Sequence, residues 1–478
     1  MRRSARITFL VPAALSRLVA GVPGHPVAGA AAAGSTSRVG TSAETQRHRR
    51  RPAGSSLGSL VGATALSASV LTVLIATGFL NPSWSGATSS EATTGSQPVP
   101  PPVWTSLVAR PIESPHPVLA ADGKVHLVYE LLVTNVSGSV MKLENLEVLD
   151  ASKGDMVVES ESGNAVVATL QGSAFAASNS PFSGQPSLTV GPYQFTRLFL
   201  DVPFAKDARL PTVLLHRFQF TLDPAAGNPP MASATVVSGR TEVLTHVSPV
   251  VIGPPVAGPR WVDAIGCCSP PSVHRTATLP INGQIIAGER FDIDFVELNP
   301  EGKLYSGPDN QLSSYAYEGT EVLAVADGTV VNLQDGQPEQ TPGSGNFPPA
   351  LTLQQGLGNY VVLDIGHGHF AFYAHFQPHT LKVKVGERVH AGQVLARLGN
   401  SGNTDAPHLH FGIHDGPSVF SADSLPFVFS SFIVAGTMIN SFDHDVQAAG
   451  MPAVIGPAAA GSHHNELPLE NQVITFPK

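Results

Sequence analysis

Two histidines separated by one residue, His408 and His410, are the residues of this chain most suited to chemistry; they lie in the stretch Pro407-His-Leu-His-Phe411. A β-strand places every second side chain on the same face, so in a strand both imidazoles point to one side. Zinc binds histidine nitrogen at ~2.0–2.1 Å and in catalytic sites keeps one position open for water. A His-x-His pattern also occurs as an exposed or hydrogen-bonded pair, so by itself it leaves both interpretations open.

Two strands that must position these histidines are predicted upstream. The runs 359–365 and 369–375, rich in Val, Ile, Tyr and Phe, flank Gly366-His367-Gly368 and predict a β-hairpin whose second strand ends at His375. Glycines spaced through 384–402 are typical of a compact antiparallel sheet. The remaining nearby histidines carry less weight, because they fall in the hairpin turn, in expected surface loops or farther along the strand: His367, His369, His379, His390 and His414.

Five short motifs follow one another in the C-terminal half of the chain: Arg290-Phe-Asp-Ile-Asp294, Val325-Ala-Asp-Gly-Thr-Val330, Gly358-Asn-Tyr-Val-Val362, Phe372-Tyr-Ala-His375 and Pro407-His-Leu-His-Phe411. In order and spacing they resemble the lysostaphin-like (LytM-type) zinc metallopeptidases over roughly residues 270–435. The resemblance implies an antiparallel β-sheet metallopeptidase domain that holds one zinc ion and cleaves peptide cross-bridges of bacterial peptidoglycan.

The same resemblance implies roles for individual residues. Asp294 and His410 correspond to zinc ligands, while His375 and His408 correspond to the pair that handles protons and the oxyanion. The family's first ligand is a histidine four residues before the aspartate, and this chain has Arg290 there. Arginine is a permanent cation with no lone pair for a metal, so this ligand does not carry over.

Three interpretations of this substitution stay open: another residue supplies the ligand, the site binds metal weakly, or the domain keeps the fold without the chemistry. His274 is the best candidate for a replacement, because a short hairpin after it would fold it back toward Asp294. Cys267 and Cys268 are a weaker source of a thiolate ligand, and vicinal cysteines bridge each other only with strain.

Arg290 itself has two further interpretations. With Asp292 it would form a charged, solvated rim at the start of a strand. Alternatively, its guanidinium would pair with Asp294 and take the place of the cation, which would make the domain a pseudo-enzyme.

Composition places the chain among β-rich multidomain proteins. It has 478 residues, 13% of them charged, with 46 Gly and 41 Pro, and this length allows two or three domains. Nine of the 27 Lys and Arg lie in the first 51 residues, which leaves 18 against 35 Asp and Glu in the rest. The absence of a basic patch there argues against nucleic acid as a partner.

The N-terminal part predicts export. Residues 57–80 contain no charged side chain and are long enough to cross a bilayer as a helix. We therefore expect a disordered basic N-terminus (1–55), a signal anchor or cleaved signal peptide (56–81) and a Ser/Thr/Pro linker (82–103). The protein is expected in the cell envelope, membrane-anchored through residues 57–80 or secreted.

Alternating apolar residues and turn signals from 104 to 250 predict an immunoglobulin-like β-sandwich, interpreted as a spacer and docking module. A linker (251–269), the peptidase domain (270–435) and a C-terminal tail (436–478) follow. The fold class is thus mainly β. We expect a cell-envelope zinc metalloendopeptidase acting on peptidoglycan peptides. The alternatives are a catalytically degenerate domain that binds the wall or regulates another hydrolase, and a purely structural envelope protein.

Overall fold

The computed structural model describes residues 104–152, 165–171, 175, 179–180, 188–223, 235–268, 272–343 and 352–477. This part of the chain is mainly β, as the sequence predicts. The predicted N-terminus (1–55), hydrophobic segment (56–81) and linker (82–103) lie outside the described residues. Within those residues, no helix has the length and apolar character needed to cross a membrane.

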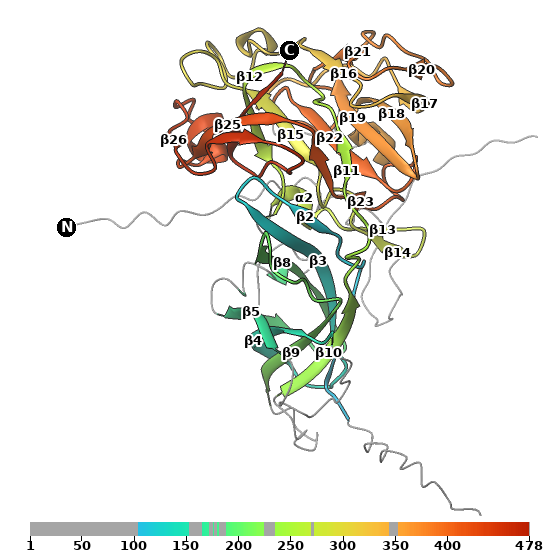
Figure 1. Cartoon of the computed structure of the whole chain (residues 1–478), viewed down its shortest axis with the longest axis vertical. Helices are drawn as coiled ribbons and strands as arrows, with labels where there is room; N and C mark the ends of the chain where they lie inside the picture. The colour runs from blue at the N-terminus through green and yellow to red at the C-terminus, as the bar shows by residue number, and fades with distance from the viewer. Residues whose placement is uncertain are drawn as a thin grey trace, which may run out of the picture. The chain divides into compact units, whose positions relative to one another are not determined.

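The described residues between 104 and 242 form two antiparallel sheets (Figure 1). The first has the order β1-β3-β8-β6, with β2 on β3: β1 (Leu107–Pro111), β2 (Pro117–Leu119), β3 (Lys124–Asn135), β6 (Asn179–Ser180) and β8 (Phe195–Ala205). The second has the order β10-β9-β4-β5, with β7 on β4: β4 (Met141–Asp150), β5 (Ala165–Gln171), β7 (Thr189–Val190), β9 (Val213–Leu222) and β10 (Thr235–Glu242).

One apolar core joins these two sheets. In β4 and β9 the apolar side chains alternate with polar ones, so each strand buries one face, as half-buried antiparallel strands do. Buried residues of both sheets contact each other, among them Leu131 of β3, Leu146 of β4 and Phe218 of β9. The two-sheet arrangement is therefore a feature of the structure, while its immunoglobulin-like topology stays a prediction.

The C-terminal half is organised around a 12-stranded sheet of order β20-β17-β18-β19-β22-β15-β12-β28-β25-β26, with β23 on β22 and β27 on β25. Its strands are β12 (Gly258–Ile265), β15 (Ile293–Glu297), β17 (Gly328–Gln334), β18 (Asn359–Gly366), β19 (His369–Phe376), β20 (Arg388–Val389), β22 (Leu409–His414), β23 (Ser424–Leu425), β25 (Phe432–Met438), β26 (Ile455–Gly456), β27 (Gly461–His463) and β28 (Gln472–Phe476).

Three two-stranded sheets and four short helical segments complete the described part. The strand pairs are β11 (Val250–Ile252) with β24 (Phe427–Phe429), β13 (Leu279–Ile281) with β14 (Gln284–Ile286), and β16 (Glu321–Leu323) with β21 (Val394–Arg397). The helical segments are α2 (Val273–Thr276), η1 (Leu312–Ser314), α3 (Leu353–Gly356) and η2 (Phe442–Ala448).

Two predicted boundaries differ from the structure. The expected linker 251–269 contains most of β11 and all of β12, and the expected tail 436–478 supplies β26, β27 and β28. Strand β28 lies between β12 and β25, where Phe476 is buried against Phe295 and Phe429. The short strand is held by partners some 40 to 220 residues away, and a local pattern does not reveal such partners.

Three neighbouring strands of the large sheet, β19, β22 and β15, carry the residues singled out by the sequence (Figure 1). The predicted hairpin is present, because β18 and β19 pair antiparallel around the turn at Gly366. Strand β22 pairs with β19 on one side and with β15 on the other. This order brings side chains from residues more than 100 positions apart onto one small area of the sheet.

Candidate metal site

Strand register places Asp294 directly opposite His410, since β15 and β22 pair antiparallel at these two residues. Their side chains meet on the same face: His410 Nδ1 is 2.9 Å from Asp294 Oδ1. Both residues are buried. Two of the predicted ligands are thus in direct contact, although they lie 116 residues apart in the sequence.

His274 reaches the same place from the short helix α2. The side chain of Ser272 caps this helix by accepting a hydrogen bond from the Arg275 amide, and the β13–β14 hairpin then turns the chain back toward β15. His274 is 4% exposed. Its Nδ1 donates to the carbonyl of Asp292 at 2.9 Å, which leaves Nε2 facing Asp294 Oδ2 at 3.3 Å.

Arg290 does not lie where either interpretation placed it. It is 4% exposed, so it is no solvated rim, and it pairs with Glu130 of β3 instead of Asp294. Its Nη2 and Nε donate to Glu130 Oε2 at 2.6 and 2.9 Å. The guanidinium of Arg290 therefore binds a buried carboxylate of the N-terminal sheets, not the carboxylate of the candidate metal site.

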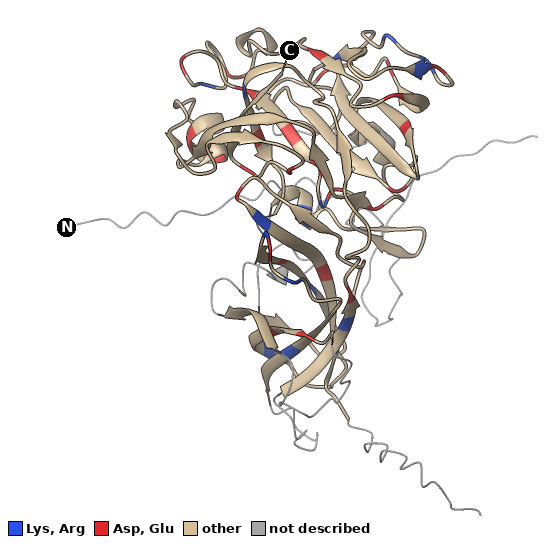
Figure 2. Ribbon diagram, in the orientation of Figure 1, with Lys and Arg blue, Asp and Glu red and all other residues tan. Residues whose placement is uncertain are grey.

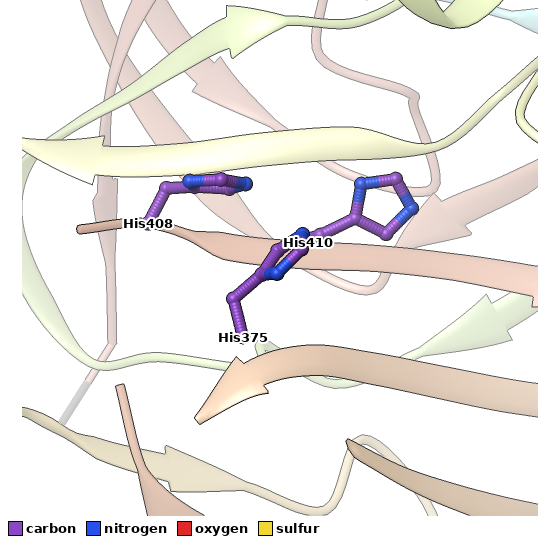
Figure 3. Close-up of side chains that lie close together, drawn as sticks. All are labelled: His375, His408 and His410. Carbon is purple, nitrogen blue, oxygen red and sulfur yellow. The ribbon is translucent and has the colours of Figure 1, made fainter. Parts of the chain in front are cut away.

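His375 and His408 stand beside this group, as Figure 3 shows together with His410. The imidazole rings of His375 and His408 are 4.5 Å apart between centroids. His375 Nδ1 donates to the carbonyl of Ser401 at 2.7 Å, and His408 Nδ1 donates to the carbonyl of Ala406 at 2.9 Å. A carbonyl only accepts, so in both rings Nε2 is the nitrogen with the free lone pair.

Burial keeps both of these histidines neutral. Desolvation, followed by the neighbouring histidines, holds the pKa of His375 well below its usual value. Desolvation also lowers the pKa of His408, although the carboxylate of Asp294 works against it. Two neutral imidazoles with lone pairs on Nε2 are therefore present, the form in which a histidine accepts a proton.

The opposite shift holds for the two histidines that face Asp294, whose pKa values are raised. Burial disfavours the imidazolium of His274, but the Asp294 carboxylate outweighs it and raises the pKa of His274 to about 9. The pKa of His410 is likewise raised, against burial, by hydrogen bonds to Asp292 and Asp294. The pKa of Asp294 falls well below its usual value in spite of burial, because the charge of His274 and hydrogen bonds from His274 and His410 stabilise its carboxylate. The carboxylates of Asp292 and Asp294 therefore favour a positive charge beside them.

Asp292 belongs to the candidate site, whereas the sequence analysis placed it only in a charged rim with Arg290. Its Oδ2 is 3.1 Å from His410 Nε2 and 3.0 Å from His414 Nε2, and Ser424 Oγ donates to its Oδ1 at 2.9 Å. Asp292 precedes Asp294 by two positions, so a shared strand face was the available signal. His414, which the sequence places farther along the strand, is buried against Asp292.

The cysteines do not join this group. Cys267 and Cys268 form a disulfide with each other, so neither offers a thiolate to Asp294. His274, Asp294 and His410 place one ligand atom each within 4.8 Å of one another, and so do His375, His408 and His410. Nitrogen and carboxylate oxygen are ligands that zinc takes, and three protein ligands leave its fourth position open. The donor set therefore fits a zinc ion.

The candidate site is thus a buried His/Asp donor set on an antiparallel sheet, with two further histidines beside it. Residues 311–421 match the model of Peptidase family M23. The lysostaphin-like, LytM-type resemblance is thereby confirmed over a segment of the chain. The family match starts after Asp294 and therefore leaves the aspartate and the Arg290 substitution outside it.

Two curated proteins and one solved structure illustrate the similarity. The murein hydrolase activator EnvC of Escherichia coli (strain K12) is 38% identical over 98 residues, which is 20% of this chain and 19% of that protein. The peptidoglycan DD-endopeptidase ShyA of Vibrio cholerae is 34% identical over 98 residues, 19% of this chain and 21% of that protein. The lysostaphin catalytic domain of Staphylococcus simulans has a TM-score of 0.20 at 24% identity, covering 35% of this chain and 88% of that one.

The chain thus spans about a fifth of the length of the curated relatives that it matches. Relatives of the segment include both peptidoglycan endopeptidases and a hydrolase activator. For the matched segment, these findings support a relationship to cell-wall hydrolases and their regulators.

Proposed function

We propose that this protein is a zinc metalloendopeptidase that hydrolyses peptide bonds of bacterial peptidoglycan, with His274 in the role of the missing first ligand. One observation carries the proposal: ligand atoms of His274, Asp294 and His410 lie within 4.8 Å of one another. Arg290, which occupies the family position, is engaged by Glu130 and leaves the space next to Asp294 to the imidazole of His274.

Within this proposal the residues divide their work. A bound zinc ion would act as a Lewis acid and lower the pKa of water to about 7. His375 and His408, held by the Ser401 and Ala406 carbonyls, present Nε2 lone pairs that accept and return a proton. Asp292 orients His410 through its second ring nitrogen, the usual role of a carboxylate behind a metal-binding histidine.

A catalytically degenerate domain that binds the wall or regulates another hydrolase is the second candidate. Arg290 in place of the family histidine and the similarity to a hydrolase activator favour it. Export through residues 57–80, with a membrane-anchored or secreted protein, belongs to either candidate, as does an immunoglobulin-like spacer formed by residues 104–250. Figure 2 shows Lys and Arg together with Asp and Glu over the described part. A partner other than nucleic acid belongs to this proposal.

The test is metal analysis of the full chain after dialysis, because a fragment ending near 440 would lose β28 from the sheet. We expect about one zinc ion per chain, lost in His274→Ala, Asp294→Ala and His410→Ala and kept in His379→Ala, whose side chain is exposed. His375→Ala and His408→Ala should keep the metal but fail to release new amino groups from purified peptidoglycan.

The outcomes separate the candidates. Zinc that survives His274→Ala would refute the replacement ligand while keeping the enzyme. A parent protein without zinc and without hydrolysis, but sedimenting with peptidoglycan or stimulating a second hydrolase, would establish the degenerate domain.

A further inference from the structure

A second cluster of metal-ligating side chains lies away from the site described above. His126 of β3, Asp201 of β8 and Cys268, which follows β12, each place a ligand atom within 4.8 Å of the others. His126 is 5% and Cys268 3% exposed, and the Asp201 side chain is 19% exposed. Imidazole, carboxylate and thiolate are all zinc ligands, and their donor atoms on one tetrahedral ion lie roughly 3.3–3.8 Å apart.

The histidine is oriented as a metal-binding histidine is. His126 Nδ1 faces Asp201 Oδ1 at 2.8 Å, while Nε2 faces Asp122 Oδ1 at 3.3 Å. A metal next to Asp201 would therefore meet Nδ1, and the other ring nitrogen would donate to a second carboxylate. A histidine ligand that donates its free N–H to a carboxylate is a recurrent feature of zinc sites.

Cys268 is held at this place by Arg275. The guanidinium donates from Nη1 to the Cys268 carbonyl at 2.9 Å and from Nη2 to the Leu200 carbonyl at 3.2 Å. Leu200 directly precedes Asp201 on β8, so one buried arginine fixes the cysteine segment against the strand that carries the carboxylate. Cys267 is not part of the group; its carbonyl accepts from the Glu470 amide.

The disulfide decides whether this group can bind a metal. The thiolate is the sulfur species that ligates metals, and in the Cys267–Cys268 disulfide neither sulfur carries that charge. A dithiol reductant would transfer two electrons and two protons to the S–S bond, becoming a disulfide itself and leaving two thiols. Cys268 would then release its proton on binding. One thiolate, one carboxylate and a neutral imidazole balance a divalent cation, so the buried site would carry no net charge.

We propose that His126, Asp201 and reduced Cys268 form a second, redox-controlled binding site for a thiophilic divalent cation such as Zn²⁺. This site is separate from the group around Asp294 and does not depend on its activity. The disulfide with Cys267 closes the site, and reduction opens it.

The adjacent cysteines supply a matched pair of variants for the test. Cys267→Ala leaves Cys268 as a free thiol without any reductant, whereas Cys268→Ala removes the ligand. The probe is Cd²⁺ added to the full chain, because a cadmium–thiolate bond absorbs in the ultraviolet. The His274, Asp294 and His410 group contains no sulfur and gives no such band.

We expect the band, saturating at one thiolate-bound Cd²⁺ per chain, in Cys267→Ala and its absence in Cys268→Ala and in the oxidised parent. Adding His126→Gln or Asp201→Asn to Cys267→Ala should weaken Cd²⁺ binding by at least about tenfold, since loss of even a hydrogen-bond partner behind a ligand costs that much. The parent, reduced with dithiothreitol and freed from it by anaerobic gel filtration, should regain the band.

The proposal is overturned if Cys267→Ala gives no band while its circular dichroism matches the parent. It is also overturned if the band is unchanged by His126→Gln and Asp201→Asn, since cadmium would then bind the thiol alone. If Cys267→Ala does not fold, the reduced parent decides by the same criteria.

Discussion

Glu130 is a buried carboxylate whose removal should affect the whole C-terminal half of the protein. It belongs to β3, and it pairs with two arginines that flank the candidate metal site in the sequence. Arg275 directly follows His274, and Arg290 precedes Asp294 by four residues. Arg290 Nη2 lies 2.6 Å and Arg275 Nε 3.4 Å from the carboxylate oxygens. The substitution Glu130→Gln keeps the shape of this side chain and removes its charge.

The expected cost follows from burial. The side chains of Glu130 and Arg275 are fully buried, and that of Arg290 is 4% exposed. Removing one partner of a buried ion pair destabilises a protein by about 3–5 kcal/mol, because the remaining charge is left without compensation. Here two guanidinium groups lose their partner, so we expect a value at the upper end, with weakened zinc binding as the two flanking segments loosen.

The assay is urea unfolding, followed by tryptophan fluorescence, for which the buried Trp261 serves as an internal probe. The matched control is Glu147→Gln, which removes the partner of Arg217 in the N-terminal sheets, where the two side chains are 21% and 18% exposed. This pair is partly exposed to water, so breaking it should cost less than breaking the fully buried Glu130 group. A Glu130→Gln variant no less stable than Glu147→Gln would refute the reasoning.

Three further predictions concern single positions. Gly358→Ala should cost about 2–5 kcal/mol of unfolding free energy and displace the Ser401 carbonyl that holds His375, because a Cβ at φ +66° would lie 2.2 Å from that oxygen. The control Gly368→Ala, with open space around its Cβ, should cost only about 1–2 kcal/mol, and equal losses in the two variants would contradict the steric argument. Burial lowers the pKa of His216 from 6.5 to about 4, so the neutral ring stabilises the fold fully above pH 6.5, and up to about 3 kcal/mol of unfolding free energy is lost as pH falls toward 4. In His216→Gln the unfolding free energy should lose this pH dependence, and an unchanged slope would rule out His216 as its source. Asp292→Asn should weaken zinc binding by roughly 10–100-fold in a chelator competition, whereas Asp327→Asn, at an exposed position, should leave the zinc affinity unchanged. Equal zinc affinities in the two variants would show that Asp292 has no role in zinc binding.

Local patterns predicted the parts of the candidate site that depend on neighbouring residues. Alternation and glycine placement predicted the hairpin of β18 and β19, and the His-x-His spacing predicted a strand where β22 lies, with His408 directly before it and His410 within it. The order of short motifs indicated the lysostaphin-like segment. These features follow from the two-residue period of a strand and from turn chemistry, which a sequence displays directly.

Long-range partners were not visible in this way. Arg290 was expected as a solvated rim or as a partner of Asp294, and it pairs with Glu130, 160 residues earlier in the chain. The terminal strand β28 was expected as a tail, and it completes the sheet beside β12. Both depend on which surfaces pack together, because a buried charge must find its partner wherever the fold brings one.

The sequence by itself thus determined the mainly β class, the lysostaphin-like segment and the histidine strand, all of which are encoded over short stretches of chain. Tertiary structure alone decided that His274 lies against Asp294, that Glu130 holds Arg290 away from it, and that Cys268 lies beside His126 and Asp201. The physical reason is that side chains distant in sequence meet only through sheet register and core packing, which no local pattern specifies.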